Sequence, residues 1–112
     1  MQKAEVDSTY PINIRQLLEI AVKRNASDLH LVVGYPPALR VAGDIVVLEY
    51  PVIKPREIEG LLLPILKEEQ LKQLKENLEL DFSYAIEGLA RFRGNIMLQR
   101  GTYAAAFRAV PF

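Results

Sequence analysis

The stretch from residue 90 to residue 99 constrains the fold most, because its side chains alternate with a period of two. Apolar or small residues occupy every second position, and mostly polar residues occupy the positions between them. That period is typical of a β-strand with one buried face and one exposed face. The polar face of this predicted strand carries two arginines, Arg91 and Arg93.

A second strand is predicted over residues 103–110, which are short, apolar and bounded by aromatic residues. Arg100 and Gly101 lie between the two strands, and glycine tolerates the positive φ that a tight turn needs. If these two residues form the centre of a hairpin, Gln99 pairs with Thr102. A three-residue turn would instead shift the register of the whole hairpin.

The two-residue turn places Arg93 opposite Arg108 and Asn95 opposite Ala106. Opposite side chains share a face, and like charges there cost about 0.2–1 kcal/mol. With Arg91, three arginines would crowd one face of the hairpin, and no acidic residue of these two strands offsets them. Arginine suits phosphate because its planar fork makes bidentate contacts. The pattern indicates either an anion site or a solvated strand face, and spacing alone favours the solvated face.

Length and composition narrow the class of protein. The chain has 112 residues, which suits one compact domain. Its 14 basic and 14 acidic residues balance, which argues against a nucleic-acid binder that works through bulk charge. The absence of cysteine excludes disulfides and thiolate metal sites and is consistent with a reducing cytosol. The first residues lack an apolar signal core and no apolar run reaches the length of a membrane span, so we expect a soluble intracellular domain.

Three helices are predicted from apolar spacing and end signals. The first starts near Asn13, a good N-cap residue. The second starts at Pro55, and Pro64 should bend or split it. The third covers residues 67–77, with Leu78 expected to point inward.

The remaining alternating stretches complete the fold prediction. They predict strands over residues 26–34, 38–41, 45–48 and 80–86. The order of helix, three strands, two helices and three strands points to an α+β fold, with helices packed on one face of an antiparallel sheet. A PAS-like arrangement is one such fold. We expect residues 1–11 to be a lead-in and residues 12–112 to form the domain.

The residues carry little sign of catalytic chemistry. The chain has no Gly-x-x-x-x-Gly-Lys-Ser/Thr phosphate loop, and its glycines are scattered. His30, the only histidine, shares a strand face with Asp28, but one histidine and one carboxylate make a weak metal or acid–base site, and a structural or surface role is preferred. The serines have no triad partners. From the residues alone we expect a binding or coupling module rather than a complete enzyme.

Several stretches, taken together, resemble a known family. Their order and spacing are similar to the N-terminal domain of the type IV pilus retraction ATPases, which drive twitching motility and belong to the secretion ATPase superfamily. The similarity runs from about residue 13 to residue 112. Gly94 departs mildly from the pattern, because a larger apolar residue is expected there. The matching stretches are residues 26–31, 34–44, 80–84, 88–95, 99–101 and 107–111.

The resemblance implies a PAS-like N-terminal domain, a short linker and a RecA-like domain with Walker A and Walker B motifs. This sequence stops at Phe112, before those motifs, so we expect no catalytic residue and no cofactor of its own. The implied parent is a homohexameric ATPase that uses ATP and Mg²⁺ and works in the cytoplasm at the inner face of the inner membrane. Its implied partners are its own RecA-like domain, neighbouring subunits and the inner-membrane pilus platform protein, with neither nucleic acid nor membrane insertion expected.

The resemblance also implies a role for arginines. In this family, arginines of the N-terminal domain close over a nucleotide held mainly by the RecA-like domain. Arg93 and Arg108 match the nucleotide-sensing arginines best, and Arg91 and Arg100 match less closely. No metal ligand is implied within this chain.

Two alternative functions remain open at this point. One is the equivalent domain of a pilus-extension or type II secretion ATPase; the Ala-Ser-Asp-Leu-His and Ala-Arg-Phe-Arg sequences favour the retraction motor over it. The other is a free-standing PAS-like ligand sensor. A sensor would need an enclosed apolar pocket, and the chain shows no surplus of inward residues to line one.

Overall fold

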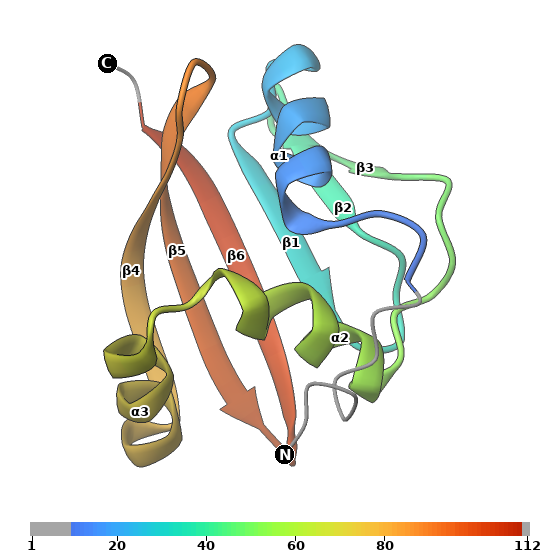
Figure 1. Ribbon diagram of the computed structural model, residues 1–112. Helices are drawn as coiled ribbons and strands as arrows, with labels where there is room; N and C mark the ends of the chain where they lie inside the picture. The colour runs from blue at the N-terminus through green and yellow to red at the C-terminus, as the bar shows by residue number, and fades with distance from the viewer. Residues whose placement is uncertain (1–9, 111–112) are drawn as a thin grey trace.

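The fold is a single six-stranded sheet with helices on one face, as seen in a computed structural model that describes residues 10–110 (Figure 1). Neighbouring strands are all antiparallel, and their order across the sheet is β3-β2-β1-β6-β5-β4. The predicted α+β fold with an antiparallel sheet is therefore confirmed. In chain order the elements are α1 (Ile14–Lys23), β1 (Asp28–Val32), β2 (Ala38–Val41), β3 (Asp44–Val47), α2 (Pro55–Leu62), the 3₁₀ turn η2 (Leu63–Ile65), α3 (Glu68–Asn77), β4 (Glu79–Ile86), β5 (Ala90–Gln99) and β6 (Thr102–Val110).

The first helix begins where the sequence predicts. The Asn13 side chain accepts a hydrogen bond from the backbone N–H of Gln16 at 2.9 Å, and the Gln16 side chain accepts one from the backbone N–H of Asn13 at 3.1 Å. This reciprocal capping box satisfies two backbone donors that the first turn of a helix leaves without partners. The helix then turns Leu17 and Leu18 onto the sheet, and both are fully buried.

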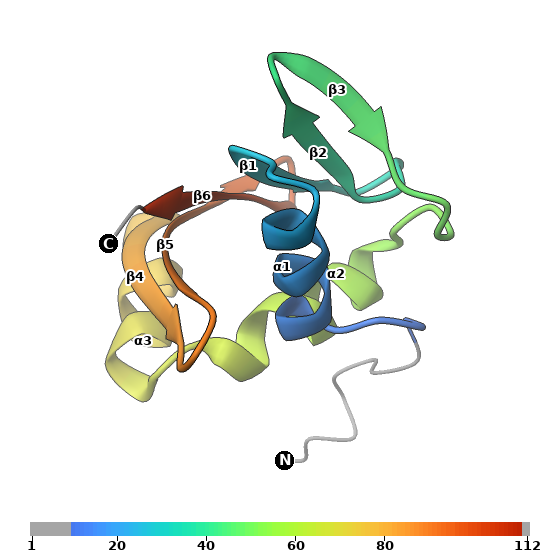
Figure 2. The same cartoon turned by 90° about the horizontal axis from the view of Figure 1, so that it is seen from above.

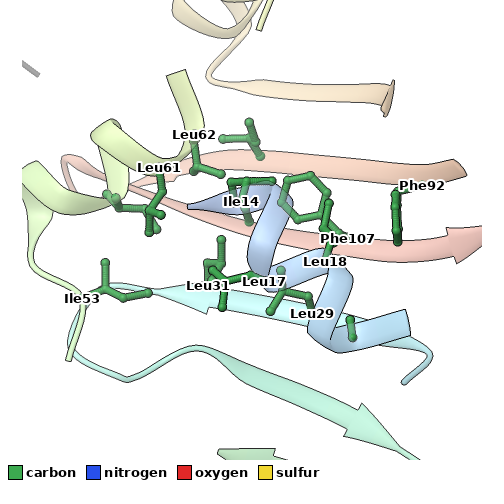
Figure 3. Packing of buried hydrophobic residues seen from close by; sticks show 14 of the residues in the cluster. Ile14, Leu17, Leu18, Leu29, Leu31, Ile53, Leu61, Leu62, Phe92 and Phe107 are labelled. Atoms are coloured by element: carbon green, nitrogen blue, oxygen red, sulfur yellow. The ribbon is translucent and has the colours of Figure 1, made fainter. Parts of the chain in front are cut away.

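The core lies between the sheet and the helices α1 and α2. Figure 3 shows Phe92 of β5 and Phe107 of β6 beside Leu18 of α1, with Leu29 of β1 close by. Figure 2 shows the same arrangement from above, with α1 and α2 under one face of the sheet. Burial of these apolar side chains is the main force that holds the layers together.

The hairpin of β5 and β6 has the predicted register. Arg100 (φ 53°) and Gly101 (φ 81°) both adopt the left-handed conformation, as a two-residue type I′ turn requires. Gln99 consequently pairs with Thr102, and Arg93 with Arg108. The two-residue length of the turn sets this register. The type I′ turn is favoured because its twist matches the twist of the strands.

The structure explains the unexpected glycine at position 94. A Cβ atom there would lie 2.6 Å from Cζ of Phe82, whose ring occupies the space that a larger side chain would fill. Phe82 and Phe107 pair with Gly94 from the two neighbouring strands, and their rings meet edge to face with centroids 5.9 Å apart. The aromatic pair thus replaces the apolar side chain that the family pattern leads one to expect.

Two predictions about the helical segment had different outcomes. Pro64 does split the second helix, because α2 ends at Leu62 and a 3₁₀ turn follows. The prediction that Leu78 points inward was wrong, since this residue is 52% exposed. Leu78 ends α3 in the left-handed conformation (φ 63°), so the chain reverses there and the helical spacing no longer applies.

The expected lead-in of residues 1–11 lies mostly outside the described residues. Tyr10 and Pro11 are described, and Tyr10 is buried in the core. Its hydroxyl donates a hydrogen bond of 2.6 Å to the carbonyl oxygen of Pro51. Burial and the nearby charge of Glu57, with a smaller contribution from Tyr50, raise the pKa of Tyr10 to about 12, so this donor keeps its proton. Tyr10 therefore anchors the chain ahead of α1.

Candidate functional site: an arginine row on the open face of the sheet

We call the face of the sheet opposite the helices its open face. This face carries a row of five residues from five neighbouring strands. We call this set the arginine row; it consists of Arg40 of β2, Asp28 of β1, Arg108 of β6, Arg93 of β5 and Ser83 of β4. Each is the direct register partner of the next across the sheet. Register partners in an antiparallel sheet lie about 5 Å apart between Cα atoms, so their side chains project side by side.

The centre of the row is an ion pair. Nε of Arg108 lies 3.1 Å from Oδ1 of Asp28, and the hydroxyl of Ser27 donates to Oδ2 of Asp28 at 2.7 Å. The carboxylate side chain is 9% exposed, whereas the Arg108 side chain is 74% exposed. Asp28 is the one buried charged residue within the described part of the chain. The pair therefore has a buried acidic end and a solvated basic end.

The surroundings keep Asp28 ionised. Burial acts to raise the pKa of this carboxyl, but the hydrogen bonds from Ser27 and Arg108 outweigh that effect, and the positive charges of Arg108 and His30 add to them. The net result is a pKa below the ordinary value of 3.8. Asp28 is thus a carboxylate at neutral pH, as an acceptor for arginine must be.

Arg40 flanks Asp28 on the other side but is bound elsewhere. Its Nη1 donates a hydrogen bond of 2.7 Å to the carbonyl oxygen of Gly43 in the turn between β2 and β3. Among residues 10–110, the ion-pair partner of Asp28 is Arg108. The row therefore keeps a net positive charge although it contains an acid.

Arg93 has no acidic partner among the residues that the structure describes. It faces a shallow hollow of about 430 Å³ that Arg108, Asn95 and Asp81 also line. Nδ2 of Asn95 donates to Oδ1 of Asp81 at 2.9 Å and, more weakly, to Oε2 of Glu79 at 3.2 Å. An anion in this hollow would meet the guanidinium groups of two neighbouring arginines, a geometry that suits phosphate.

The four arginines predicted for the site do not all come together. Arg91 follows the same face of β5 and lies two residues from Arg93, about 7 Å along the strand. Arg100 lies in the hairpin turn, seven positions beyond Arg93 or about 23 Å along the strand. Arg100 lines a different hollow of about 630 Å³ together with Val32 and Tyr103. The structure brings Arg93 and Arg108 to one hollow, places Arg91 on the same strand face outside its lining, and separates Arg100 from all three.

His30 and Asp28 do not form a site of their own. The carboxylate oxygens of Asp28 bind Arg108 and Ser27, and His30 lies in the next row, between Ala38 and Ala106. In the described part of the chain, no group of three histidine or carboxylate side chains could hold a metal ion.

Sequence reasoning missed the acidic partner of Arg108. The two strands of the hairpin hold no acid, and Asp28 comes from β1, which pairs with β6 on the side away from β5. The available signal was the position of Asp28 on the polar face of an alternating strand. The neighbour of that strand could not be read from alternation.

Comparison with known proteins identifies the relatives of this chain. No family model matches it. Over 100 residues, the chain is 39% identical to the type IV pilus retraction ATPase PilT of Pseudomonas aeruginosa, and the match covers 89% of the chain and 29% of PilT. A crystal structure of the pilus retraction motor PilT with bound ADP shares the fold at a TM-score of 0.82 and 38% identity, covering 89% of the chain and 29% of that structure. The chain is homologous to the N-terminal region of PilT.

A second relative agrees with this assignment. The twitching motility protein of Neisseria gonorrhoeae is 33% identical over 75 residues, which cover 67% of the chain and 20% of that protein. The chain thus spans less than a third of the length of these PilT relatives. The resemblance to the pilus retraction ATPases is confirmed, and so is the match to the fold of the PilT N-terminal domain. No helix among residues 10–110 is long and apolar enough to cross a membrane.

Proposed function

We propose that this chain is the N-terminal coupling and nucleotide-sensing domain of a hexameric ATPase that powers type IV pilus retraction. The observation that carries the proposal is the pairing of Arg93 with Arg108 beside an open hollow, in a chain homologous to PilT. In this proposal the motor works in the cytoplasm at the inner membrane, where it engages the pilus platform protein. The RecA-like domains of its own and neighbouring subunits are the direct partners of the chain.

The residues fit a phosphate group. Arg93 has a like charge beside it and, within the described residues, forms no ion pair, although Asp28 and Asp81 also line the hollow. A phosphate between Arg93 and Arg108 would relieve that repulsion and accept hydrogen bonds from both side chains. The ADP in the related PilT structure supports a nucleotide as the source of that phosphate.

The chemistry that follows is electrostatic. Mg²⁺ and the RecA-like domain would hold the nucleotide, and the arginines of this chain would approach its phosphates when the domains close. A positive group placed where charge develops during phosphoryl transfer can lower the barrier by several kcal/mol. Because both arginines sit on adjacent strands of one sheet, a rigid movement of the domain would deliver or withdraw them together.

The test is mutagenesis of the full-length ATPase. We expect Arg93→Ala and Arg108→Ala each to reduce ATP turnover at least about tenfold with the hexamer intact, since each removes one charged donor to phosphate. Arg91→Ala and Arg100→Ala complete the set of predicted residues. Arg100→Ala is also the matched control for the arginine row, because it removes the same side chain at a distant point of the same hairpin. Wild-type turnover in both Arg93→Ala and Arg108→Ala would remove these residues from the mechanism.

The alternatives need separate tests. The hollow between α1 and the sheet, which core residues such as Leu18 and Phe92 line, has a volume of only about 10 Å³, and that leaves little room for the ligand of a sensor. Calorimetry of the 112-residue chain with ATP should therefore show no tight binding. The full-length ATPase can also be expressed in strains that lack their own retraction, extension or secretion ATPase. Rescue of pilus retraction, and not of pilus assembly or secretion, would favour the retraction ATPase over its superfamily relatives.

A further inference from the structure

We propose that Asp28 is a positioning residue, which orients Arg108 for phosphate by holding Nε of its guanidinium group. This inference rests on the function proposed above and adds a residue from outside the hairpin to the site. The contact that carries it is the bond of 3.1 Å between Arg108 Nε and Asp28 Oδ1.

The geometry of the pair suits an anchor. A guanidinium group has five N–H donors, and Asp28 takes the one nearest the main chain. In the part of the chain that the structure describes, the terminal Nη atoms of Arg108 have no hydrogen bond, and the side chain is 74% exposed. Nε is therefore held by a buried carboxylate, while the terminal Nη atoms remain available to a phosphate in the hollow that Arg108 lines with Arg93.

The anchor itself is rigid. Asp28 belongs to β1, an interior strand that pairs with β2 on one side and β6 on the other. The second carboxylate oxygen accepts the hydroxyl of Ser27, which fixes the plane of the carboxylate. A free arginine side chain loses rotamer entropy when a ligand immobilises it, and an anchor that restricts it beforehand reduces that cost.

The electrostatics point the same way. Arg93 and Arg108 are direct register partners, and their repulsion would push both guanidinium groups apart into solvent. Asp28 lies on the side of Arg108 away from Arg93, so its attraction and this repulsion both act to keep the Arg108 guanidinium group at the carboxylate. The hydrogen bond from Arg40 to Gly43 holds the other flanking arginine elsewhere. Asp28 thus favours one defined position of Arg108 at the hollow that both arginines line.

The test is a double-mutant cycle in the full-length ATPase with Asp28→Asn, Arg108→Ala and the combined variant. We expect Asp28→Asn to lower kcat about fivefold with less than about a twofold change in KM for MgATP, since the lost orientation acts on the transition state. In the Arg108→Ala background the same substitution should change nothing further. Asp44→Asn, which removes an exposed acid at the β2–β3 turn, is the matched control and should retain wild-type turnover.

Other results would overturn the inference and would separate it from the proposed function. Wild-type kcat in Asp28→Asn beside a loss in Arg108→Ala would remove Asp28 while leaving the arginine mechanism in place. An equal loss with and without Arg108 would show that Asp28 acts through the fold alone. Wild-type kcat in Arg108→Ala would remove both Arg108 and its anchor. If Asp28→Asn does not form hexamers, Ser27→Ala repeats the cycle at an exposed residue, with a smaller loss expected only when Arg108 is present.

Discussion

The two faces of the β5–β6 hairpin share one backbone but differ in burial and in charge. Toward the helices the hairpin presents Phe92, Gly94 and Phe107, which are buried against α1 and neighbouring strands (Figure 3). Toward the open side it presents Arg93 and Arg108, which are exposed. Because side chains alternate along a strand, a residue can be changed on one face with little effect on the other. The comparison predicts that the stability of the fold depends on the buried face and the ATP turnover of the full-length ATPase on the open face.

The largest expected effect tests the buried face. Phe107→Ala should lower the free energy of unfolding by about 3–5 kcal/mol, because it removes a fully buried ring and leaves a cavity. Chemical denaturation of the 112-residue chain measures this change. Phe107→Leu is the matched control and should cost less, since most of the volume stays filled. A loss below 1 kcal/mol for Phe107→Ala would contradict the burial argument.

A smaller effect is expected at the glycine of the same face. Gly94→Ala should destabilise the domain by about 1–3 kcal/mol, because the new Cβ atom would lie 2.6 Å from the Phe82 ring. The double variant Gly94→Ala with Phe82→Leu should recover part of that loss, since the shorter side chain vacates the contact. Thermal unfolding of both variants checks the prediction. Equal stability of Gly94→Ala and the parent would show that the ring moves without cost.

The ion pair between Asp28 and Arg108 on the open face should make the stability of the fold depend on pH. Asp28 has a lower pKa in the folded chain than its ordinary value of 3.8, so it stabilises the fold above about pH 4 and loses that contribution as pH falls through the folded-state pKa. The stability difference between the parent and Asp28→Asn should therefore be constant near neutral pH and shrink below pH 4. Urea unfolding at a series of pH values measures it. A difference that grows in acid would have the wrong sign.

The smallest effect is expected on the open face. Arg93→Ala should leave the fold intact and raise stability slightly, by about 0.2–1 kcal/mol at low salt, because it removes a like charge opposite Arg108. High salt should abolish the gain through screening. Denaturation at low and high salt provides the measurement, with Arg100→Ala as the control that lacks an opposing arginine. Marked destabilisation by Arg93→Ala would mean that this side chain has a structural role after all.

The relationship of this chain to PilT concerns both faces of the hairpin, the buried face through the fold and the open face through the arginines. The fold of the PilT N-terminal domain is retained at 38% identity, because many apolar residues can fill a core of the right shape. The surroundings of Gly94 illustrate how such a core is filled, since the Phe82 ring occupies the space beside the glycine and packs edge to face on Phe107. The assignment of phosphate contacts to particular arginines does not follow from the similarity of the folds. It remains a proposal that the kinetic variants test.

The sequence alone determined the features that arise from nearby residues. Alternation identified the strands, Asn13 marked the start of α1, and Arg100 with Gly101 set the register that pairs Arg93 with Arg108. Local backbone sterics and a short turn favour these features, so they can be predicted without knowledge of distant residues.

Only the tertiary structure decided which strands became neighbours across the sheet. The placement of β1 beside β6 brings Asp28 to Arg108 across 80 positions of sequence, and no local pattern specifies that pairing. The fit of Phe82 over Gly94 has the same origin. Each depends on how separate elements share a limited volume, which is settled by packing of the whole chain rather than by any segment of it.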